Sequence, residues 1–450
     1  MQGSALSARG YSIPKDSLSL QELQDIKDEL SVSPIISGGA PIKIVPTVNK
    51  LYQESNTKIY VPKCFGLKRW GPPAKIKVSH GKAVNLTFQG DLRPEQEAPV
   101  NALYDACMNP AMMGGILNVY CGGGKTTMAL NIACKLGKKT MIVVHKDFLL
   151  DQWKERIEQF IPEARVGTIK AKIIDVSNKD IVIASLQSIS MKEYDESVFE
   201  EFGTVIVDEV HHTSAEVFSR ALRKMAFVYT IGLSATIKRK DGLSKVFIWY
   251  LGDVAFQATK RQDDVLVELT RYYDQDPRYS HTHTIMGTKP NMSKMVNNIC
   301  DWAPRNEVIL TAIRNTLTKE PCRKILVLSD RREHLKTLMA SLGDKWSTSI
   351  YVGGMKAGAL AACENKSVIF ATFAIASEGY DQKGLDTLIL ASPRSDVTQS
   401  VGRILRDKPG DRVHVPLVID IIDMFSLFVN QGNKRIGFYK SCKYDIREQK

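Results

Sequence analysis

The sequence predicts an α/β protein with two parallel-sheet domains in tandem and a small N-terminal α+β domain before them. Short runs of about six residues rich in Val, Ile and Leu recur from residue 86 onward, as expected for strands that are covered on both faces. Amphipathic stretches of helical period lie between these runs and suit right-handed βαβ crossovers. The polar stretch 274–291 interrupts the alternation once, and its composition indicates a flexible loop or insertion.

The first of these two domains is predicted over 86–262. Helices are expected at TTMALNIACKLG (126–137) and DFLLDQWKERIEQF (147–160). The expected strands are GILNVY (115–120), TMIVVH (140–145), DIVIAS (180–185), TVIVDE (204–209) and YTIGLS (229–234).

The second domain is predicted over 263–450, with a helix through HLKTLMASLG (334–343). Its expected strands are RKILVLS (323–329), TSIYVG (348–353), SVIFAT (367–372), LDTLILAS (385–392) and VPLVIDIID (415–423). Residues 1–85 form the accessory domain, in which a polar helix candidate at 19–31 is followed by loops and short β-like runs.

Composition excludes several classes of protein. The 450 residues of the chain carry a formal net charge of +12, which favours a polyanionic partner. No apolar run reaches the roughly 18 residues that a membrane span needs, and the N-terminus lacks the apolar core of a signal peptide. The eight cysteines are scattered without CxxC spacing, so neither a zinc site nor an iron–sulfur cluster is expected. These features predict an intracellular protein that binds no membrane.

A glycine-rich segment between a predicted strand and a predicted helix indicates a phosphate-binding loop. Glycines let backbone N–H groups surround phosphate oxygens, and the helix N-terminus favours negative charge. Lys125 would neutralise the β- and γ-phosphates of ATP, and the Thr126 hydroxyl would bind Mg²⁺. The predicted nucleotide-binding residues of this segment are Val119, Tyr120, Cys121, Gly122, Gly123, Gly124, Lys125, Thr126 and Thr127. Val119 stands where the strict motif has glycine, and the alternative is a glycine-rich turn that binds nothing.

Asp208 and Glu209 follow the apolar run TVIV. If this strand is adjacent to the strand before the glycine-rich loop, Asp208 can hold Mg²⁺ and Glu209 can act as general base toward the attacking water. The alternative is a solvated turn after a strand.

With CGGGKT (121–126) and DEVHH (208–212), the segments LSAT (233–236), ASEGYD (376–381) and QSVGRILR (399–406) resemble the motifs of superfamily 2 helicases. The sequence is most similar to the XPB-like branch, and within it to helicases encoded by large cytoplasmic DNA viruses. This resemblance covers about 86–450 and implies two RecA-like lobes that use ATP and Mg²⁺.

The resemblance also implies roles for single residues. Gln96 would read adenine, Asp381 would approach the ribose, and Gln399, Arg403 and Arg406 would act on the nucleotide from the second lobe, with Arg406 as arginine finger. Asp208, Glu209 and Lys125 complete the implied catalytic set. The positions expected to line the nucleic-acid groove are His145, Lys146, Ser185, Gln187, Arg239 and Thr372.

The stretch 60–82 contains six basic residues and no acid, with aromatic residues interleaved. Lys68, Arg69 and Trp70 at its centre suit phosphate contact and base stacking, so we expect the charges to face solvent or nucleic acid. The alternative is a basic edge over a small aromatic core.

Together these observations predict an ATP-dependent DNA helicase or translocase, of viral type and associated with transcription or genome handling. An RNA helicase and the motor subunit of a nuclease complex are the alternatives. Expected partners are DNA or RNA, with transcription machinery or other viral proteins, and the expected location is a virion or a viral replication site in host cytoplasm.

Overall fold

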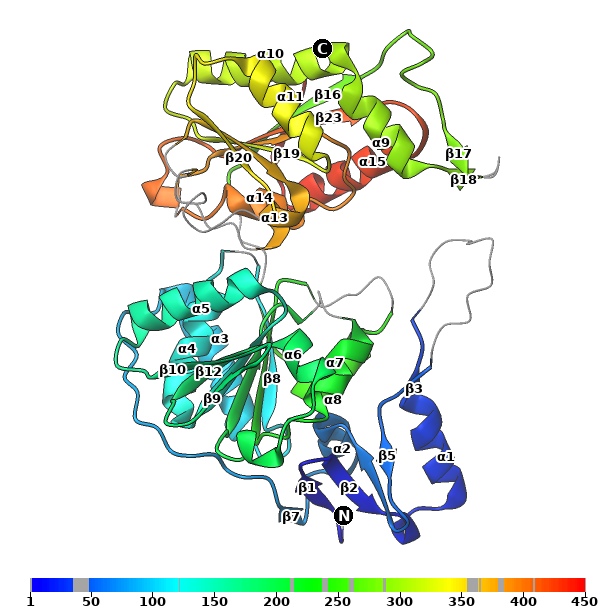
Figure 1. Ribbon diagram of the computed structural model, residues 1–450, viewed down its shortest axis with the longest axis vertical. Helices are drawn as coiled ribbons and strands as arrows, with labels where there is room; N and C mark the ends of the chain where they lie inside the picture. The colour runs from blue at the N-terminus through cyan, green and yellow to red at the C-terminus, as the bar shows by residue number, and fades with distance from the viewer. Residues whose placement is uncertain are drawn as a thin grey trace. The chain divides into compact units, whose positions relative to one another are not determined.

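The computed structural model describes residues 2–34, 48–120, 122–210, 214–236, 242–258, 263–285, 289–353, 363, 366–378, 384–407 and 409–449. The chain forms two compact units, Met1–Thr259 (unit 1) and Lys260–Lys450 (unit 2). Both contain a parallel sheet with helices on its faces (Figure 1), which confirms the predicted α/β class.

The main sheet of unit 1 has the strand order β11-β10-β12-β9-β13-β14-β8-β15. All neighbours pair in parallel except β10 and β11, which form an antiparallel hairpin. Each of the five strands expected from the apolar runs is present. The strands are β8 (Gly114–Asn118), β9 (Thr140–Val144), β10 (Val166–Lys170), β11 (Ile173–Asp175), β12 (Ile181–Ser185), β13 (Thr204–Val207), β14 (Tyr229–Ser234) and β15 (Val254–Gln257).

Two layers of helices bury this sheet (Figure 1). One face packs against α3 (Pro94–Met108), α4 (Lys125–Leu136) and α5 (Asp147–Phe160). The other face packs against α6 (Leu186–Met191), α7 (Ala215–Leu222) and α8 (Ser244–Leu251). The central strand β9 is buried at every residue, as expected for a parallel sheet covered on both sides.

The N-terminal segment adds a second sheet, with the order β5-β6-β2-β1-β7. Its side chains join those of α7 and α8 in one hydrophobic core. Because the N-terminal segment shares this core with the rest of unit 1, a separate accessory domain that ends at residue 85 stays a prediction. The elements of the N-terminal segment are β1 (Ala5–Ser7), β2 (Gly10–Pro14), η1 (Lys15–Ser17), α1 (Leu20–Glu29), β3 (Ser31–Val32), β4 (Asn49–Lys50), β5 (Gln53–Glu54), β6 (Lys58–Val61), α2 (Lys63–Trp70) and β7 (Lys75–Ile76). The rest of unit 1, called the main domain, also contains the short helix η2 (Glu196–Val198).

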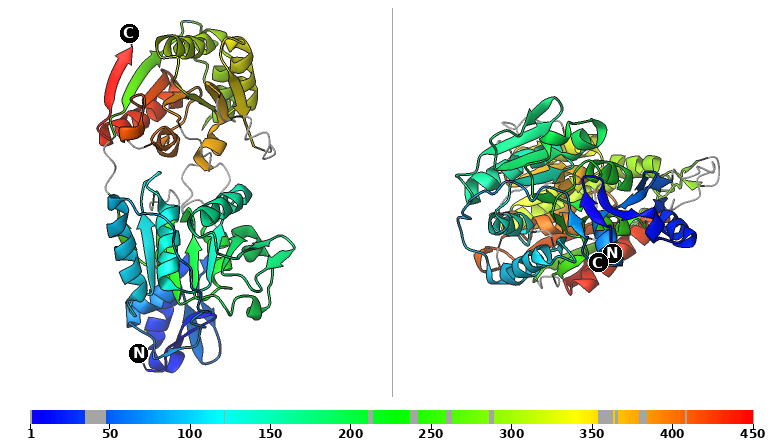
Figure 2. Two further views of the ribbon diagram at one scale, coloured as in Figure 1. Left: turned by 90° about the vertical axis from the view of Figure 1, so that its left-hand side faces the viewer. Right: turned by 90° about the horizontal axis from the view of Figure 1, so that it is seen from below.

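Unit 2 has one sheet in the order β20-β21-β19-β22-β23-β16-β24, parallel throughout. The red strand β24 and the green strand β16 lie side by side at its edge (Figure 2, left). Its strands are β16 (Leu266–Tyr272), β19 (Ile325–Ser329), β20 (Thr348–Tyr351), β21 (Val368–Thr372), β22 (Thr387–Leu390), β23 (Leu417–Asp423) and β24 (Asp445–Gln449).

The helices of unit 2 cover both faces of this sheet. Those on one face are α10 (Ala303–Lys319) and α11 (Arg332–Leu342), and α14 (Thr398–Arg403) and α15 (Ser426–Ser441) pack on the other. The remaining elements are α9 (Met292–Asp301), α13 (Phe373–Glu378) and η4 (Pro409–Asp411).

The stretch 274–291, for which a flexible loop or insertion is predicted, contains a residue that packs in a hydrophobic cluster of unit 2. Tyr279 within it is buried, and its hydroxyl donates a hydrogen bond of 2.5 Å to Asp423. Strands β17 (Thr284–Ile285) and β18 (Lys289–Pro290) then form a short antiparallel hairpin. A single buried aromatic ring can attach a polar segment to the core. The average polarity of a segment does not reveal such a ring.

Candidate nucleotide-binding site

The predicted phosphate loop joins the end of β8 to the start of α4. Gly124 is the N-cap of α4 with φ +83°, and a Cβ at this position would lie 2.0 Å from the Gln96 amide nitrogen. Only glycine fits there, both because L-residues disfavour this conformation and because space is lacking. The loop and the helix N-terminus thus have the form expected of a phosphate-binding cradle.

Lys125 and Glu209 meet at the carboxyl ends of the strands. The Lys125 ammonium lies 3.6 Å from the Glu209 carboxylate and donates to the Val119 carbonyl at 3.2 Å. Both side chains remain partly exposed. Glu209 has φ +45°, a conformation that is uncommon for a residue other than glycine and that concentrates at functional sites.

Asp208 is buried beside this pair. The Trp153 indole N–H donates to its carboxylate at 2.9 Å, and the backbone N–H of Glu209 donates to its other oxygen at 2.9 Å. Burial, followed by the negative charge of Glu209, raises the pKa of Asp208 from 3.8 to about 6. A carboxylate that is so poorly compensated is a candidate for binding a cation.

One expectation about strand order was wrong. The sequence suggested that the strand before Asp208 lies next to the strand before the loop, but β14 lies between β13 and β8. The residues still meet because the loop and the start of α4 pass over the end of β14, where the Val119 N–H donates to the Ser234 carbonyl at 3.0 Å. Ser234 belongs to the segment LSAT, so two of the sequence motifs are in contact.

Gln96 lies against the same loop. Its amide nitrogen donates to the Gly123 carbonyl at 3.1 Å, and its amide oxygen accepts from the Arg93 N–H at 3.0 Å. Its predicted partner, adenine, would have to replace or extend these bonds. Cys121 lies outside the residues that the structure describes, whereas Tyr120, Gly122, Thr126 and Thr127 are placed in the loop and the first turn of α4.

Known helicases are similar to this chain in sequence. The family model described as "Type III restriction enzyme, res subunit" matches residues 89–239. A protein of Acanthamoeba polyphaga mimivirus, whose name calls it an ATP-dependent RNA helicase, is 33% identical over 98% of this chain and 85% of its own length. A protein of Invertebrate iridescent virus 6, whose name calls it a helicase, is 27% identical over 80% of this chain and 83% of its own.

The chain belongs to the superfamily 2 helicases. It is an ATP-dependent enzyme, close to the helicases of large DNA viruses. Among solved structures, the crystal structure of T4 UvsW covers 96% of both chains with 16% identity and a TM-score of 0.37.

Four residues that this helicase family implies for nucleic-acid contact lie after neighbouring strands of unit 1. His145 and Lys146 follow β9, Ser185 is the last residue of β12, and Gln187 lies in the first turn of α6. The Gln187 amide donates to the His145 carbonyl at 2.7 Å, so the two loops are linked. His145 and Ser185 are buried, whereas Gln187 is exposed.

The other implied residues are more dispersed. Thr372 ends β21 in unit 2, half-buried, and Gln399 and Arg403 lie on α14, with Arg406 three residues beyond. Asp381 and Arg239 lie outside the described residues.

The basic stretch 60–82 differs from expectation at Lys63. This side chain is buried, and its ammonium donates to the carbonyls of Met113 and Val228 at 2.9 Å each. The expectation that all six charges face solvent or polyanion was therefore wrong. Backbone carbonyls at the start of the main sheet supply the partners that no nearby acid could.

Lys68, Arg69 and Trp70 also have partners within the chain. Lys68 pairs with Asp253 at 2.9 Å, and Arg69 pairs with Glu29 at 3.1 Å and lies over the Trp70 ring. Trp70 stacks on Tyr11, with ring centroids 6.0 Å apart. These contacts favour the alternative of a small aromatic core, and nucleic-acid contact at the three residues stays a prediction.

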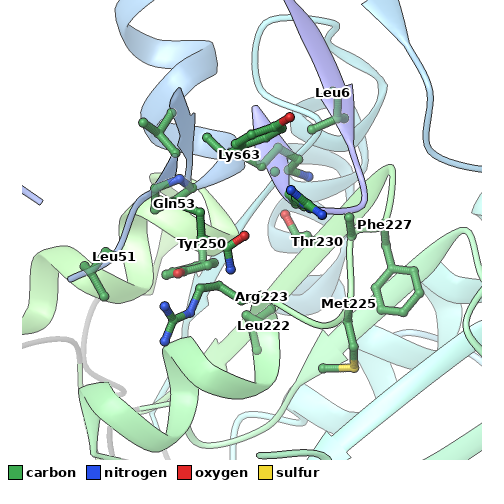
Figure 3. Close-up of a pocket in the computed structure, with 16 residues that line it drawn as sticks. Leu6, Leu51, Gln53, Lys63, Leu222, Arg223, Met225, Phe227, Thr230 and Tyr250 are labelled. Atoms are coloured by element: carbon green, nitrogen blue, oxygen red, sulfur yellow. The ribbon is translucent and has the colours of Figure 1, made fainter. Parts of the chain in front are cut away.

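A cavity lies between the N-terminal segment and the main domain of unit 1 (Figure 3). Lys63, Arg223, Gln53 and Tyr250 line it, and those of the predicted nucleotide-binding residues that the structure describes do not. It is therefore separate from the candidate site.

Two residues of the candidate site were missed by sequence reasoning. Trp153 holds Asp208, and the Arg93 guanidinium approaches the Gly122 carbonyl at 3.5 Å. A signal existed for Trp153, since it occupies a core position of an amphipathic helix and a buried indole N–H needs an acceptor.

Among the described residues, no helix is long and apolar enough to cross a membrane.

Proposed function

We propose that this helicase uses Mg-ATP hydrolysis to move along DNA. The observation that carries the proposal is the meeting of the α4 N-terminus, Lys125, Glu209 and buried Asp208 at one edge of the unit 1 sheet. Helix dipole and ammonium together favour the phosphates of a nucleotide. The position of Glu209 suits a base that accepts the proton of an attacking water.

The side chains at this edge fit Mg²⁺. The Thr126 hydroxyl and the Asp208 carboxylate are hard oxygen donors, and Asp208 is buried beside a second acid, so a bound cation would relieve its charge. When bound, the ion would neutralise charge that develops on the phosphates. Trp153 and the Glu209 backbone hold the carboxylate in place for this role.

Residues of unit 2 complete the proposal. We assign Arg406 to the γ-phosphate, with Arg403 and Gln399 beside it and Asp381 at the ribose. Arg406 is chosen because a guanidinium carries a permanent charge in a planar fork that matches phosphate oxygens.

The nucleic-acid groove would involve His145, Lys146, Ser185, Gln187, Thr372 and Arg239. Binding of this kind is directed to the phosphate backbone and is independent of sequence. Partners in viral transcription or genome handling, and a virion or a replication site in host cytoplasm, form part of the same proposal.

RNA is the second candidate substrate, because the name of the mimivirus relative calls that protein an RNA helicase. Steady-state ATPase without nucleic acid, with single-stranded DNA, with duplex DNA and with RNA separates the candidates. DNA stimulation that exceeds RNA stimulation supports the proposal, and the reverse order overturns the choice of DNA. Lys125→Ala serves as the background control, and stimulated turnover that persists in this variant contradicts the assigned site.

A further inference from the structure

Seven residues link the end of β22 to α14, the helix that carries Gln399 and Arg403. This stretch, 391–397, is called the β22–α14 loop here. Side chains from three other elements of unit 2 form hydrogen bonds or ion pairs with the first half of this loop. Two of the ties come from buried arginines, and each arginine is itself held by a buried aspartate of β23.

The first arginine approaches from α10. Arg305 is fully buried, and it forms an ion pair with Asp423, which is equally buried, including a hydrogen bond of 3.1 Å from Nη2 to Oδ2. Its Nη1 donates to the carbonyl of Ala391 at 2.6 Å. Tyr279 donates to the same carboxylate and so fixes its orientation.

The second arginine approaches from α15 on the opposite face of the sheet. Arg435 is buried and donates to Asp420 through Nε and Nη2, at 2.8 Å each, while its Nη1 bonds the carbonyl of Arg394. Asp420 and Asp423 lie three positions apart on one strand, so their side chains point to opposite faces. One strand therefore anchors the loop through both helical layers.

A third tie comes from the end of β19. The backbone N–H of Asp330 donates to the Ser392 hydroxyl at 2.9 Å, and its carboxylate pairs with Arg394 at 3.2 Å. The β22–α14 loop is therefore held at Ala391, Ser392 and Arg394, before α14 begins.

We propose that Arg305 and Arg435 are positioning residues that set where α14 presents Arg403 and, beyond it, Arg406 for ATP hydrolysis. The inference rests on the proposed function, which assigns those two arginines to the nucleotide. Its physical basis is that a guanidinium can bond a carboxylate and a carbonyl at once through a rigid fork, whereas a lysine ammonium cannot reproduce both directions. Burying two ion pairs is costly, and hydrophobic replacements often match their stability. The geometry of the Arg305 and Arg435 ion pairs is therefore better explained by a role in positioning the β22–α14 loop than by a contribution to folding stability alone.

The chain offers a matched control in Arg323. It is also buried in unit 2 and also pairs with an acid, Glu320, while its Nη1 donates to the Val415 carbonyl at 3.1 Å and to the Thr387 hydroxyl. These acceptors lie at the amino ends of β22 and β23, the opposite edge of the sheet from the β22–α14 loop. Replacing Arg323 should disturb unit 2 without displacing α14.

The experiment measures steady-state kcat and KM for ATP, with saturating nucleic acid, in Arg435→Lys, Arg305→Lys and Arg323→Lys. We expect kcat to fall about 10–100-fold in the first two because misplacement of a catalytic group by a fraction of an ångström to an ångström has effects of this size. KM for ATP should change much less, and Arg323→Lys should keep the wild-type kcat even where its melting temperature falls equally.

A double-mutant cycle with Arg406→Ala separates positioning from general destabilisation. If Arg435 acts by placing Arg403 and Arg406, then Arg435→Lys should cause a much smaller loss of rate in the Arg406→Ala background than in the wild-type protein. Independent, multiplicative losses would overturn the inference, as would a wild-type kcat in folded Arg435→Lys and Arg305→Lys. If Arg435→Lys does not fold, Asp420→Asn combined with Arg435→Met removes both charges together and is tested in the same way.

The double-mutant cycle also distinguishes failure of the proposed function from failure of the positioning inference. A wild-type rate in Arg406→Ala contradicts the role given to Arg406 under the proposed function, and the positioning inference fails with it. A strong loss in Arg406→Ala with unchanged rates in the lysine variants leaves the proposed function intact and rejects the positioning inference alone.

Discussion

Asp208 of unit 1 and the two buried aspartates of β23 in unit 2 are surrounded in different ways. In unit 2, Asp420 and Asp423 are each bonded by a buried arginine and by a tyrosine hydroxyl. In unit 1, buried Asp208 is bonded by the indole of Trp153 and a backbone N–H, both uncharged, and the nearby Lys125 ammonium lies 3.6 Å from Glu209. Burial, followed by the negative charge of Glu209, raises the pKa of Asp208.

This difference separates a carboxylate with a structural partner from one that can accept a ligand. A permanently paired carboxylate contributes position and stability, and it cannot bind a cation without losing its partner. A buried carboxylate held only by neutral donors is oriented, yet its charge remains to be compensated. Asp208 of unit 1 is therefore the carboxylate that we propose as a cation ligand, and Asp420 and Asp423 of unit 2 hold the arginines that bond the β22–α14 loop.

Glu209→Gln should produce the largest effect. ATP hydrolysis should fall by about 10²–10⁴-fold, the range for loss of a general base, because the amide cannot accept the proton of water. ATP binding should persist, since the α4 N-terminus and Lys125 remain. Single-turnover hydrolysis and nucleotide titration measure the two properties separately, and hydrolysis at the wild-type rate would rule out Glu209 as the base.

Asp423→Asn and Asp208→Asn should have unequal effects on stability. The first leaves the Arg305 charge buried without its partner, which should lower the free energy of unfolding by about 3–5 kcal/mol. The second loses one of the two N–H hydrogen bonds of Asp208 but also removes a poorly compensated charge, so the free energy of unfolding at pH 7 should change much less. Urea denaturation of the protein without nucleotide or Mg²⁺ measures both, and losses of equal size would break the comparison.

The pH dependence of stability sharpens this contrast. Because the pKa of Asp208 is higher in the folded state, about 6 against the ordinary 3.8, the folded protein binds the proton more tightly than the unfolded chain. The contribution of Asp208 to stability should therefore decline as pH rises from about 4 to about 6. Asp208→Asn should lack this decline, and an identical pH profile in the two proteins would contradict the assigned shift.

Trp153→Phe should have a smaller effect. The ring still fills its place in the core, but Asp208 loses the indole donor that orients it. Removal of such an outer partner typically costs about 10–100-fold in metal affinity or activity. ATPase measured over a Mg²⁺ titration should show a higher Mg²⁺ requirement, with little change in thermal stability. An unchanged Mg²⁺ requirement would show that Trp153 serves only as packing.

Lys68→Ala should have the smallest effect. Its ion pair with Asp253 is largely exposed, so the free energy of unfolding should change by no more than about 1 kcal/mol. If Lys68 contacts a phosphate of duplex DNA, the log–log salt slope of binding should decrease in magnitude by about 0.9. A salt titration with wild-type and Lys68→Ala proteins decides this, and equal slopes would leave Lys68 a purely intramolecular role.

The sequence alone determined the α/β class, because a strand buried on both faces must be apolar along its length and β9, β12, β13 and β19 all are. It also predicted a glycine-rich loop between a strand and a helix, and the structure places this segment between β8 and α4. The edge strand β24 was missed because its residues are polar and mostly exposed, so no apolar run marks it.

Tertiary structure alone decided which charges are paired. Lys63 looks like any other lysine of a basic stretch, yet it binds two carbonyls from strands distant in sequence. Asp208, Asp420 and Asp423 each end or interrupt an apolar run, and only Asp208 is marked by a second acid after it. Their roles differ because Arg305 and Arg435 reach two of them and Trp153 reaches the third. Such partners lie far away in the sequence, and the strength of a charge interaction depends on burial and distance, which the fold alone establishes.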